Sequence, residues 1–450
     1  MFVVTAMIVL LPTVFFPRIE ADDSSHTIEW LTSLYVSTNG ALWRNATGWR
    51  SSVIGASSLS PCEWHGVQCD ASGIVTSVSL VDNGLQGTLS YSFVQNPNLR
   101  FLDLSHNHLT GTLPALFFVS FPMLQVLRLS DNALMGTLPD PIGGSHFLTE
   151  LYLDRNQLTG EVPMGILHCP LRILDLTSNH FLGKPPAGLI FMPILETLRL
   201  GRNSFRMQLS ELLVLPSGTT SALQSLDLSS NYFEDQIPDT ISQFTLLVSL
   251  DLTGNILRGT LPVLSSLVHL THLHIGRNEL QGTIPEDVWL LPMLVSIKID
   301  DNHFRGMAPS AHLLKNTNVK FLYLAKNDFS GPIPAYTTLT ELTTALNPWE
   351  CPLPEAFQGW FDAPPTTICT VRVPRVLKNS RSKRVPLTRM TVLWLNFIVF
   401  LGLTIPCLIK VGGFSPWRVV LLIPSGWLSR AYVRLSSVIV ARETDVVCRV

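Results

Sequence analysis

Side chains that could bind a charged partner recur along this chain at regular intervals. They occupy equivalent positions in successive short apolar segments and form two groups. The first cluster comprises Arg128, Tyr152, Arg155, Arg199 and Arg202. The second cluster comprises His272, His274, Arg277, Lys298 and Tyr323. Arg and Tyr are enriched among residues that dominate binding energy, so both clusters are candidate ligand-binding sites. The alternative is an ordinary solvated surface, because these positions must hold some residue.

The histidines of the second cluster also raise the question of a metal ion. On a strand, His272 and His274 would share one face, and Asp251 on the adjacent strand would be a third ligand. Lys298 on the other neighbouring strand would repel a cation. No metal site is therefore predicted, and no cofactor either.

Catalysis is not indicated by the rest of the sequence. It contains no nucleophile-and-base spacing, no phosphate-binding glycine loop and no carboxylate pair that stands out. Residues 22–371 carry 17 basic and 30 acidic side chains, and such an acidic domain argues against nucleic acid as a partner. The chemistry expected of this chain is recognition, not an enzyme reaction.

The elements that position the two clusters are eleven copies of the pattern L-x-x-L-x-L-x-x-N. Each L-x-L core alternates with period two, which predicts a short strand with one buried face. One such strand cannot bury its leucines alone, so neighbours must stack into a solenoid with a curved parallel sheet on its concave face. The copies end at Asn83, Asn107, Asn132, Asn156, Asn179, Asn203, Asn231, Asn255, Asn278, Asn302 and Asn327.

The asparagines and the segments after them have structural explanations. An inward-pointing amide must be hydrogen-bonded, so the asparagines are expected to join neighbouring coils. The pattern G-x-[LIV]-P follows most of them, as in Gly111-Thr-Leu-Pro114. Glycine permits positive φ and proline removes a donor, which predicts an irregular, extended or 3-10 convex side. The copy between Asn203 and Asn231 is longer, with an inserted loop near Pro216, and Asp235 stands where glycine is expected.

This two-part unit, over residues 75–334, resembles the plant-type class of extracellular leucine-rich repeats. The segment Pro61-Cys62-Glu-Trp64-His-Gly66-Val67-Gln-Cys69 resembles the amino-terminal cap of that family, which here would span residues 22–74. Residues 335–371, with Asn347-Pro-Trp349-Glu-Cys351, look like a carboxy-terminal cap. Short-range closure of each cap would pair Cys62 with Cys69 and Cys351 with Cys369. Cys169 is left over as a buried, inert thiol.

Disulfide-bonded caps imply an oxidising compartment, and the sequon at Asn45 agrees with secretion and glycosylation. Residues 1–21 contain an apolar run expected to be a signal peptide. Residues 392–409 are long and apolar enough for a single transmembrane helix. A basic juxtamembrane segment (372–391) precedes this helix and a short basic tail (410–450) follows it. The flanking charges favour the opposite orientation, but the disulfides and sequon place the repeats outside the plasma membrane.

Two functions are compatible with these features. One is a cell-surface recognition protein that binds a peptide, protein or glycan on the concave face. Here the chain resembles plant receptor-like proteins without a kinase, which implies a co-receptor with its own catalytic domain. The other is an abundant structural or adhesive surface antigen, because the repeats are also similar to those of kinetoplastid surface antigens. A secreted enzyme inhibitor is disfavoured by the membrane span.

Overall fold

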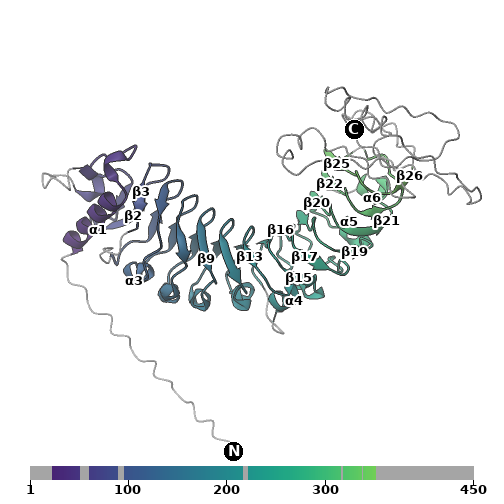
Figure 1. The fold of residues 1–450 in the computed structure, drawn as a ribbon, viewed down its shortest axis with the longest axis horizontal. Coiled ribbons are helices and arrows are strands. Elements are labelled where there is room, and N and C mark those ends of the chain that lie inside the picture. Colours follow the sequence, from purple (N-terminus) through teal and green to yellow (C-terminus); the bar gives the residue numbers. More distant parts are fainter. Residues whose placement is uncertain are drawn as a thin grey trace, which may run out of the picture.

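The computed structural model describes residues 23–50, 60–89, 96–215, 221–315, 318–336 and 338–350. They form a curved solenoid with helix α1 (Asp23–Ser37) at one end and strands β25 (Glu341–Thr343) and β26 (Trp349–Glu350) at the other (Figure 1). In this part of the chain no helix is both long and apolar enough to span a bilayer. The following predictions lie outside the described residues: the signal peptide (1–21), the Cys351–Cys369 disulfide, the juxtamembrane segment (372–391), the span (392–409) and the tail (410–450).

One thirteen-stranded sheet runs the length of the solenoid. Its first two strands are antiparallel, and every later pair is parallel and in register from coil to coil. The central Leu, Ile or Val of each repeat strand is buried, as the period-two pattern predicts. The strands are, in order, β1 (Val67–Cys69), β2 (Val75–Ser79), β4 (Phe101–Asp103), β6 (Val126–Arg128), β8 (Glu150–Tyr152), β10 (Ile173–Asp175), β12 (Thr197–Arg199), β14 (Ser225–Asp227), β16 (Ser249–Asp251), β18 (His272–His274), β20 (Ser296–Lys298), β22 (Phe321–Tyr323) and β25.

Short strands after the asparagines pair into small parallel sheets beside the main one, a regularity that the sequence did not predict. They are β3 (Gln86–Thr88), β5 (His108–Thr110), β7 (Met135–Thr137), β9 (Gln157–Gly160), β11 (His180–Gly183), β13 (Ser204–Phe205), β15 (Glu234–Gln236), β17 (Ile256–Arg258), β19 (Gln281–Gly282), β21 (His303–Gly306), β23 (Asp328–Phe329), β24 (Gly331–Pro332) and β26. The in-register stacking of successive coils places these segments at pairing distance.

The convex side carries the expected 3-10 turns and also short α-helices, which were not predicted; α3 and α4 mark this outer side in Figure 1. The helices are α3 (Phe117–Ser120), α4 (Leu209–Leu212), α5 (Glu286–Trp289) and α6 (Ala311–Lys315). The 3-10 helices are η1 (Gly40–Leu42), η2 (Pro61–Glu63), η3 (Asp140–Gly144), η4 (Met164–His168), η5 (Ala187–Phe191) and η6 (Asp239–Gln243). Several of their apolar residues, such as Phe117, Ile142 and Leu189, are buried and join one apolar core that runs the length of the solenoid.

The asparagines join each coil to the preceding one. The Nδ2 of Asn179 donates to the carbonyls of Leu153 (2.9 Å) and Leu176 (3.1 Å), and its Oδ1 accepts from the Leu158 N–H (3.0 Å). Asn347 makes the same bonds, accepting from the Phe329 N–H (3.1 Å). The ladder therefore continues one coil past the eleven predicted copies, into the region predicted as a cap.

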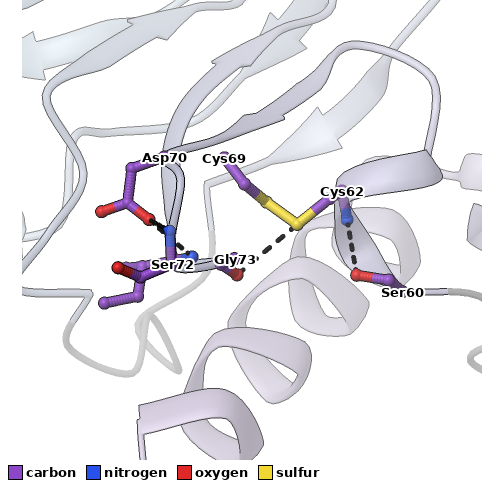
Figure 2. The surroundings of a disulfide bond; sticks show 7 residues. Ser60, Cys62, Cys69, Asp70, Ser72 and Gly73 are labelled. Atoms are coloured by element: carbon purple, nitrogen blue, oxygen red, sulfur yellow. Dashed lines mark hydrogen bonds between the residues drawn. A yellow bond between two sulfur atoms is a disulfide. The ribbon is translucent and has the colours of Figure 1, made fainter.

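The amino-terminal cap attaches to the same ladder. Asn83 accepts from the Asn45 N–H (2.8 Å) and donates to its carbonyl (2.9 Å), so the cap loop takes the place of a preceding coil. The predicted Cys62–Cys69 disulfide is present and joins η2 to β1 (Figure 2). Beside it, Asp70 Oδ1 accepts from the N–H groups of Ser72 and Ile74. The disulfide and these hydrogen bonds hold the segment between η2 and β2 at the edge of the main sheet.

Aromatic rings fill the interior of this cap. Trp30 and Trp49 are fully buried, and Trp49 lies 4.9 Å from Trp43 and 5.2 Å from Trp64 between ring centroids. Trp30 also packs edge-to-face on Phe121 of the second repeat coil. The cap thereby shields the apolar end of the solenoid from water.

The irregular repeat leaves a residue in an unfavourable backbone conformation. Asp235 has a φ of +78° at the position that is glycine in most other coils. A side chain is disfavoured there, so Asp235→Gly should raise the free energy of unfolding by about 0.5 kcal/mol, measured by chemical denaturation. The neighbouring Glu234→Gly is the control, because Glu234 lacks positive φ and the same change should lower stability. A loss of stability in Asp235→Gly would contradict the argument.

Candidate functional site

The structure divides the first cluster between the concave face and the turns at its edge. Arg128, Tyr152 and Arg199 end strands β6, β8 and β12, and register places Asp175 between Tyr152 and Arg199. Arg155 and Arg202 instead follow the strands in left-handed turns, with φ of +53° and +55°. The cluster therefore occupies the concave face and its rim.

The arginines that lie on the concave face are paired with acids. Arg128 lies 3.2 Å from Glu150 and 3.9 Å from Asp103, and its guanidinium lies over the rings of Phe101 and Tyr152. The Arg199 guanidinium is 3.3 Å from Asp175. The part of the strip that lies on the concave face is thus charge-compensated.

These pairs belong to a longer network that sequence reasoning missed. Glu150 also bonds to Arg172, and Arg172 lies 3.0 Å from Glu196. We call the series Asp103, Arg128, Glu150, Arg172 and Glu196 the charge ladder. It crosses from β4 to β12, and only 15% of the Glu150 side chain is exposed. The residues occupy three different positions relative to their strands: Asp103 and Arg128 end strands, Glu150 begins one, and Arg172 and Glu196 precede theirs. A comparison of equivalent repeat positions could therefore not reveal the whole series.

The charge ladder changes the ionisation of its members. Burial alone would raise the pKa of Glu150, but hydrogen bonds from Arg172 and Arg128 outweigh burial and lower it. The hydrogen bonds that Arg172 donates to Glu150 and Glu196 raise its pKa. Both groups are therefore held in their charged forms, which favours a network that persists at neutral pH.

Aspartates on the concave strands have a structural role as well. Each accepts a hydrogen bond from the backbone N–H two residues later, where the strand turns. The acceptors are Asp103, Asp175, Asp227 and Asp251, with distances of 2.9 to 3.0 Å. For Asp227, burial raises the pKa, and neighbouring aspartates raise it further. These aspartates stabilise the strand ends, so the basic and aromatic residues remain the candidates for ligand contact.

The second cluster is placed differently. His272 and His274 lie on β18, Lys298 on β20 and Tyr323 on β22, in three neighbouring strands. The Lys298 Nζ lies 5.2 Å from the centroid of the Tyr323 ring and has no ion pair among the described residues. Arg277 lies in the turn after β18, with a φ of +55°. The structure thus brings four of the five predicted residues together on the concave face.

Hydrogen bonds hold both histidine rings. His274 lies 3.0 Å from Ser296 Oγ and 3.5 Å from Asp251, and His272 Nδ1 lies 2.8 Å from Thr271 Oγ1. The two rings meet edge to face, with centroids 5.7 Å apart. Among the described residues no group of three or more His, Cys, Asp and Glu side chains has a metal-binding arrangement.

Ionisation at the second cluster follows from these contacts. Burial lowers the pKa of His272, and the neighbouring His274 and Lys298 lower it further. Burial would raise the pKa of Asp251, but its hydrogen bond with His274 and those at Thr253 reverse the effect and lower it. At neutral pH, His272 is therefore uncharged and Asp251 is charged.

Two other predicted sites are described. Asn45 Oδ1 accepts from the N–H and the hydroxyl of Thr47, at 3.1 and 2.8 Å, within the partly exposed cap loop. Cys169 is buried with its thiol 3.2 Å from the Ile142 carbonyl, and burial raises its pKa to about 11. A thiol of that pKa is protonated at neutral pH and unreactive, as predicted.

Known proteins share this architecture. Six segments match the family model described as Leucine Rich Repeat: residues 98–119, 123–145, 147–169, 170–192, 222–244 and 269–291. Receptor-like protein 41 of Arabidopsis thaliana is 35% identical over 208 residues, which are 45% of this chain and 23% of that protein. Receptor like protein 24 of the same plant is 30% identical over 315 residues, 58% of this chain and 36% of that protein. The chain spans well under half the length of these relatives.

Solved structures of plant receptors are also similar to this chain. The ectodomain of the Arabidopsis thaliana membrane receptor kinase GASSHO1/SCHENGEN3, in complex with CASPARIAN STRIP INTEGRITY FACTOR 2, has a TM-score of 0.61 and 28% identity. The match covers 73% of this chain and 42% of that one. The plant peptide hormone receptor RGFR1, in complex with RGF2, has a TM-score of 0.53 and 26% identity, and the match covers 60% and 48%.

Proposed function

We propose that this chain, whose repeats are plant-type extracellular leucine-rich repeats like those of receptor-like proteins, is a cell-surface recognition protein. It binds an extracellular peptide, protein or glycan on its concave face. The chain has no catalytic role in this proposal, and signalling or adhesion requires a partner, such as a co-receptor with its own catalytic domain. The proposal includes a signal peptide, a glycan on Asn45 and a single membrane span with the repeats outside.

One observation carries the proposal. The exposed positions of the main sheet differ from strand to strand, while the buried leucines and asparagines repeat. Twelve parallel strands at a spacing of about 4.8 Å offer a surface roughly 50 Å long to an extended ligand. Solved relatives of the same fold are complexes, one of them a peptide hormone receptor. These facts favour a recognition surface over a purely structural one.

The test uses the full-length chain on a cell surface. Surface cross-linking followed by mass spectrometry identifies captured partners of the parent and of two variants. Ser225→Trp places a bulky ring in the middle of the concave face, and Gln243→Trp places the same ring on an exposed site of η6 on the convex side. We expect the concave variant to lose at least about tenfold in partner recovery, because ligand contacts concentrate near the centre of an interface.

The convex variant should behave like the parent. Equal recovery of all partners from both variants would refute concave-face recognition. Failure of the abundant parent chain to recover a specific partner would also refute it, and would favour the alternative of a structural or adhesive surface antigen.

A further inference from the structure

The two halves of the concave face differ in how their cations are satisfied. The residue just before each strand of the main sheet has two neighbours on the concave face. One is the first strand residue of the preceding coil. The other is the residue just before the strand of the next coil. For Arg172 these neighbours are Glu150 and Glu196, and both form ion pairs with it. For Lys320, the equivalent positions hold Ser296 and Thr340. Lys320 is exposed, and no described residue forms an ion pair with it.

The same contrast holds for the last residue of each strand. Arg128 and Arg199 each have an aspartate at that position on the preceding strand, and each pairs with it. Lys298 has His274 and Tyr323 as its neighbours in register. Its ammonium contacts the Tyr323 ring instead of a carboxylate. Arg128, Arg172 and Arg199 in the centre of the face are thus neutralised by neighbouring acids. Among the described residues Lys298 and Lys320 of the carboxy-terminal half have no such partner and can pair with a ligand, and Arg100 near the other end is likewise without an ion pair.

The carboxylates near Lys298 and Lys320 either contact another side chain or form no ion pair with these lysines. Asp251 faces His274, and Glu341 accepts the Tyr323 hydroxyl at 2.8 Å. Asp300 lies two residues beyond Lys298, and its charge acts on Tyr323. Towards His272, strand β16 presents Ser249 and Asp251, and β20 presents Ser296 and Lys298. His272 itself has no contact with a carboxylate among the described residues, so its positive charge would be uncompensated after protonation.

We propose that the surface formed by His272, His274, Lys298, Lys320 and Tyr323 binds a carboxylate-rich stretch of a peptide partner, and binds it more tightly as the medium becomes acidic. We call this surface the cationic patch. The inference rests on the proposed function and specifies which part of the concave face makes contact and with what chemistry. Charge complementarity carries it, because a partner carboxylate would gain an ion pair here without breaking an existing one.

The direction of the pH effect follows from linkage. The pKa of free His272 lies below 6.5 because of burial and the nearby His274 and Lys298. A bound carboxylate would raise this pKa, so the complex holds more protons than the free protein. Affinity therefore increases as pH falls through this range, by about fivefold for a coupling of somewhat under one pKa unit. The gain ends near pH 4, where partner carboxylates become protonated.

Fluorescence anisotropy on the full-length chain tests the proposal. The probe is a short labelled peptide of alternating Glu and Ala, compared with a peptide of alternating Gln and Ala. We expect the Glu peptide to bind more tightly, with higher affinity at about pH 5.5 than at about pH 7.5. Lys298→Gln should weaken its binding by about tenfold, and His272→Gln should remove most of the pH dependence.

Arg305→Gln provides a matched control. Arg305 is an exposed cation of β21, on the same coil as Lys298 but outside the main sheet, and no described residue forms an ion pair with it. This variant should bind like the parent. Equal binding of the two peptides, or no effect of Lys298→Gln, would overturn the acidic-partner assignment. A pH-independent affinity in the parent would overturn the pH dependence. Neither result bears on the Ser225→Trp capture experiment, so a failure here leaves concave-face recognition standing.

Discussion

Asn179→Ala is expected to lower the free energy of unfolding by about 2 kcal/mol, because a buried polar group left without a partner costs about 1–3 kcal/mol. The substitution leaves the Leu158 N–H without its acceptor. The carbonyls of Leu153 and Leu176 lose one bond each but still accept from Asn156 and Asn203. Chemical denaturation, followed by circular dichroism, measures the change.

His180→Ala is the control for this experiment. His180 is the next residue in the chain, its side chain is exposed on β11, and its removal should change stability by less than about 0.5 kcal/mol. If Asn179→Ala loses no more stability than His180→Ala, the side-chain amides of the repeat asparagines are dispensable for folding. Asn179→Asp sharpens the test, because it keeps an acceptor for Leu158 but places an oxygen against the two carbonyls. Its stability should recover partly at low pH, where a protonated acid can donate again.

Glu150→Gln is expected to destabilise the protein by about 2 kcal/mol while leaving the cationic patch intact, because it removes a largely buried carboxylate that pairs with two partly exposed arginines. Glu150 binds both Arg128 and Arg172, and its own side chain is only 15% exposed. Denaturation at neutral pH measures the loss. The same experiments with the Glu peptide should give unchanged affinity, since the charge ladder lies on other strands.

Glu211→Gln is the matched control. Glu211 pairs with Lys184 at 2.9 Å, but both side chains are largely exposed, and the change should cost less than about 0.5 kcal/mol. The contribution of Glu150 also has a predicted pH dependence. Its pKa is lowered in the folded state, so the stabilisation is present above its unfolded pKa and is lost as pH falls through the folded value. The parent and Glu150→Gln should therefore converge in stability in acid, and a constant difference would contradict the charge ladder.

The two stability predictions concern residues that hold the concave face together, not residues proposed to contact a ligand. Asn179 fixes the spacing between coils, and Glu150 fixes arginines across strands β6, β8 and β10. Neither is offered to a ligand. Lys298 and His272 form no ion pair with another described residue, so changes there should affect binding more than folding.

The repeat pattern was sufficient to predict most of the fold. Leu151 and Leu153 are fully buried and Tyr152 between them is not, as period two requires. The inward asparagines are hydrogen-bonded as expected. The small parallel sheets and the coil closed by Asn347 were not predicted. Leu339 and Leu342 do stand at the regular spacing before Asn347, but Thr344 replaces the third leucine of the pattern.

The candidate site was only partly predictable. The sequence placed Arg128, Tyr152 and Lys298 at exposed strand positions, and the structure agrees. It could not indicate that Arg128 is neutralised by Glu150 while Lys298 has no acidic partner in the described part of the chain, because the first pair is separated by 22 residues in the sequence. The turn position of Arg155 and Arg202 was also missed, since the left-handed backbone before each asparagine has no fixed residue type.

By itself, the sequence determined the solenoid, its buried and exposed faces, the amino-terminal disulfide and the structural role of the asparagines. These properties depend on residue type and on spacing within one repeat, and both are local. Only the tertiary structure decided which charges meet. Ion pairs form between strands whose register is set by the stacking of whole coils, and a shift of one residue would reverse every facing side chain. The stacked sheet, not the repeat pattern, thus leaves Lys298 and Lys320 without an ion pair to any described residue, on a face where Arg128 and Arg172 are neutralised.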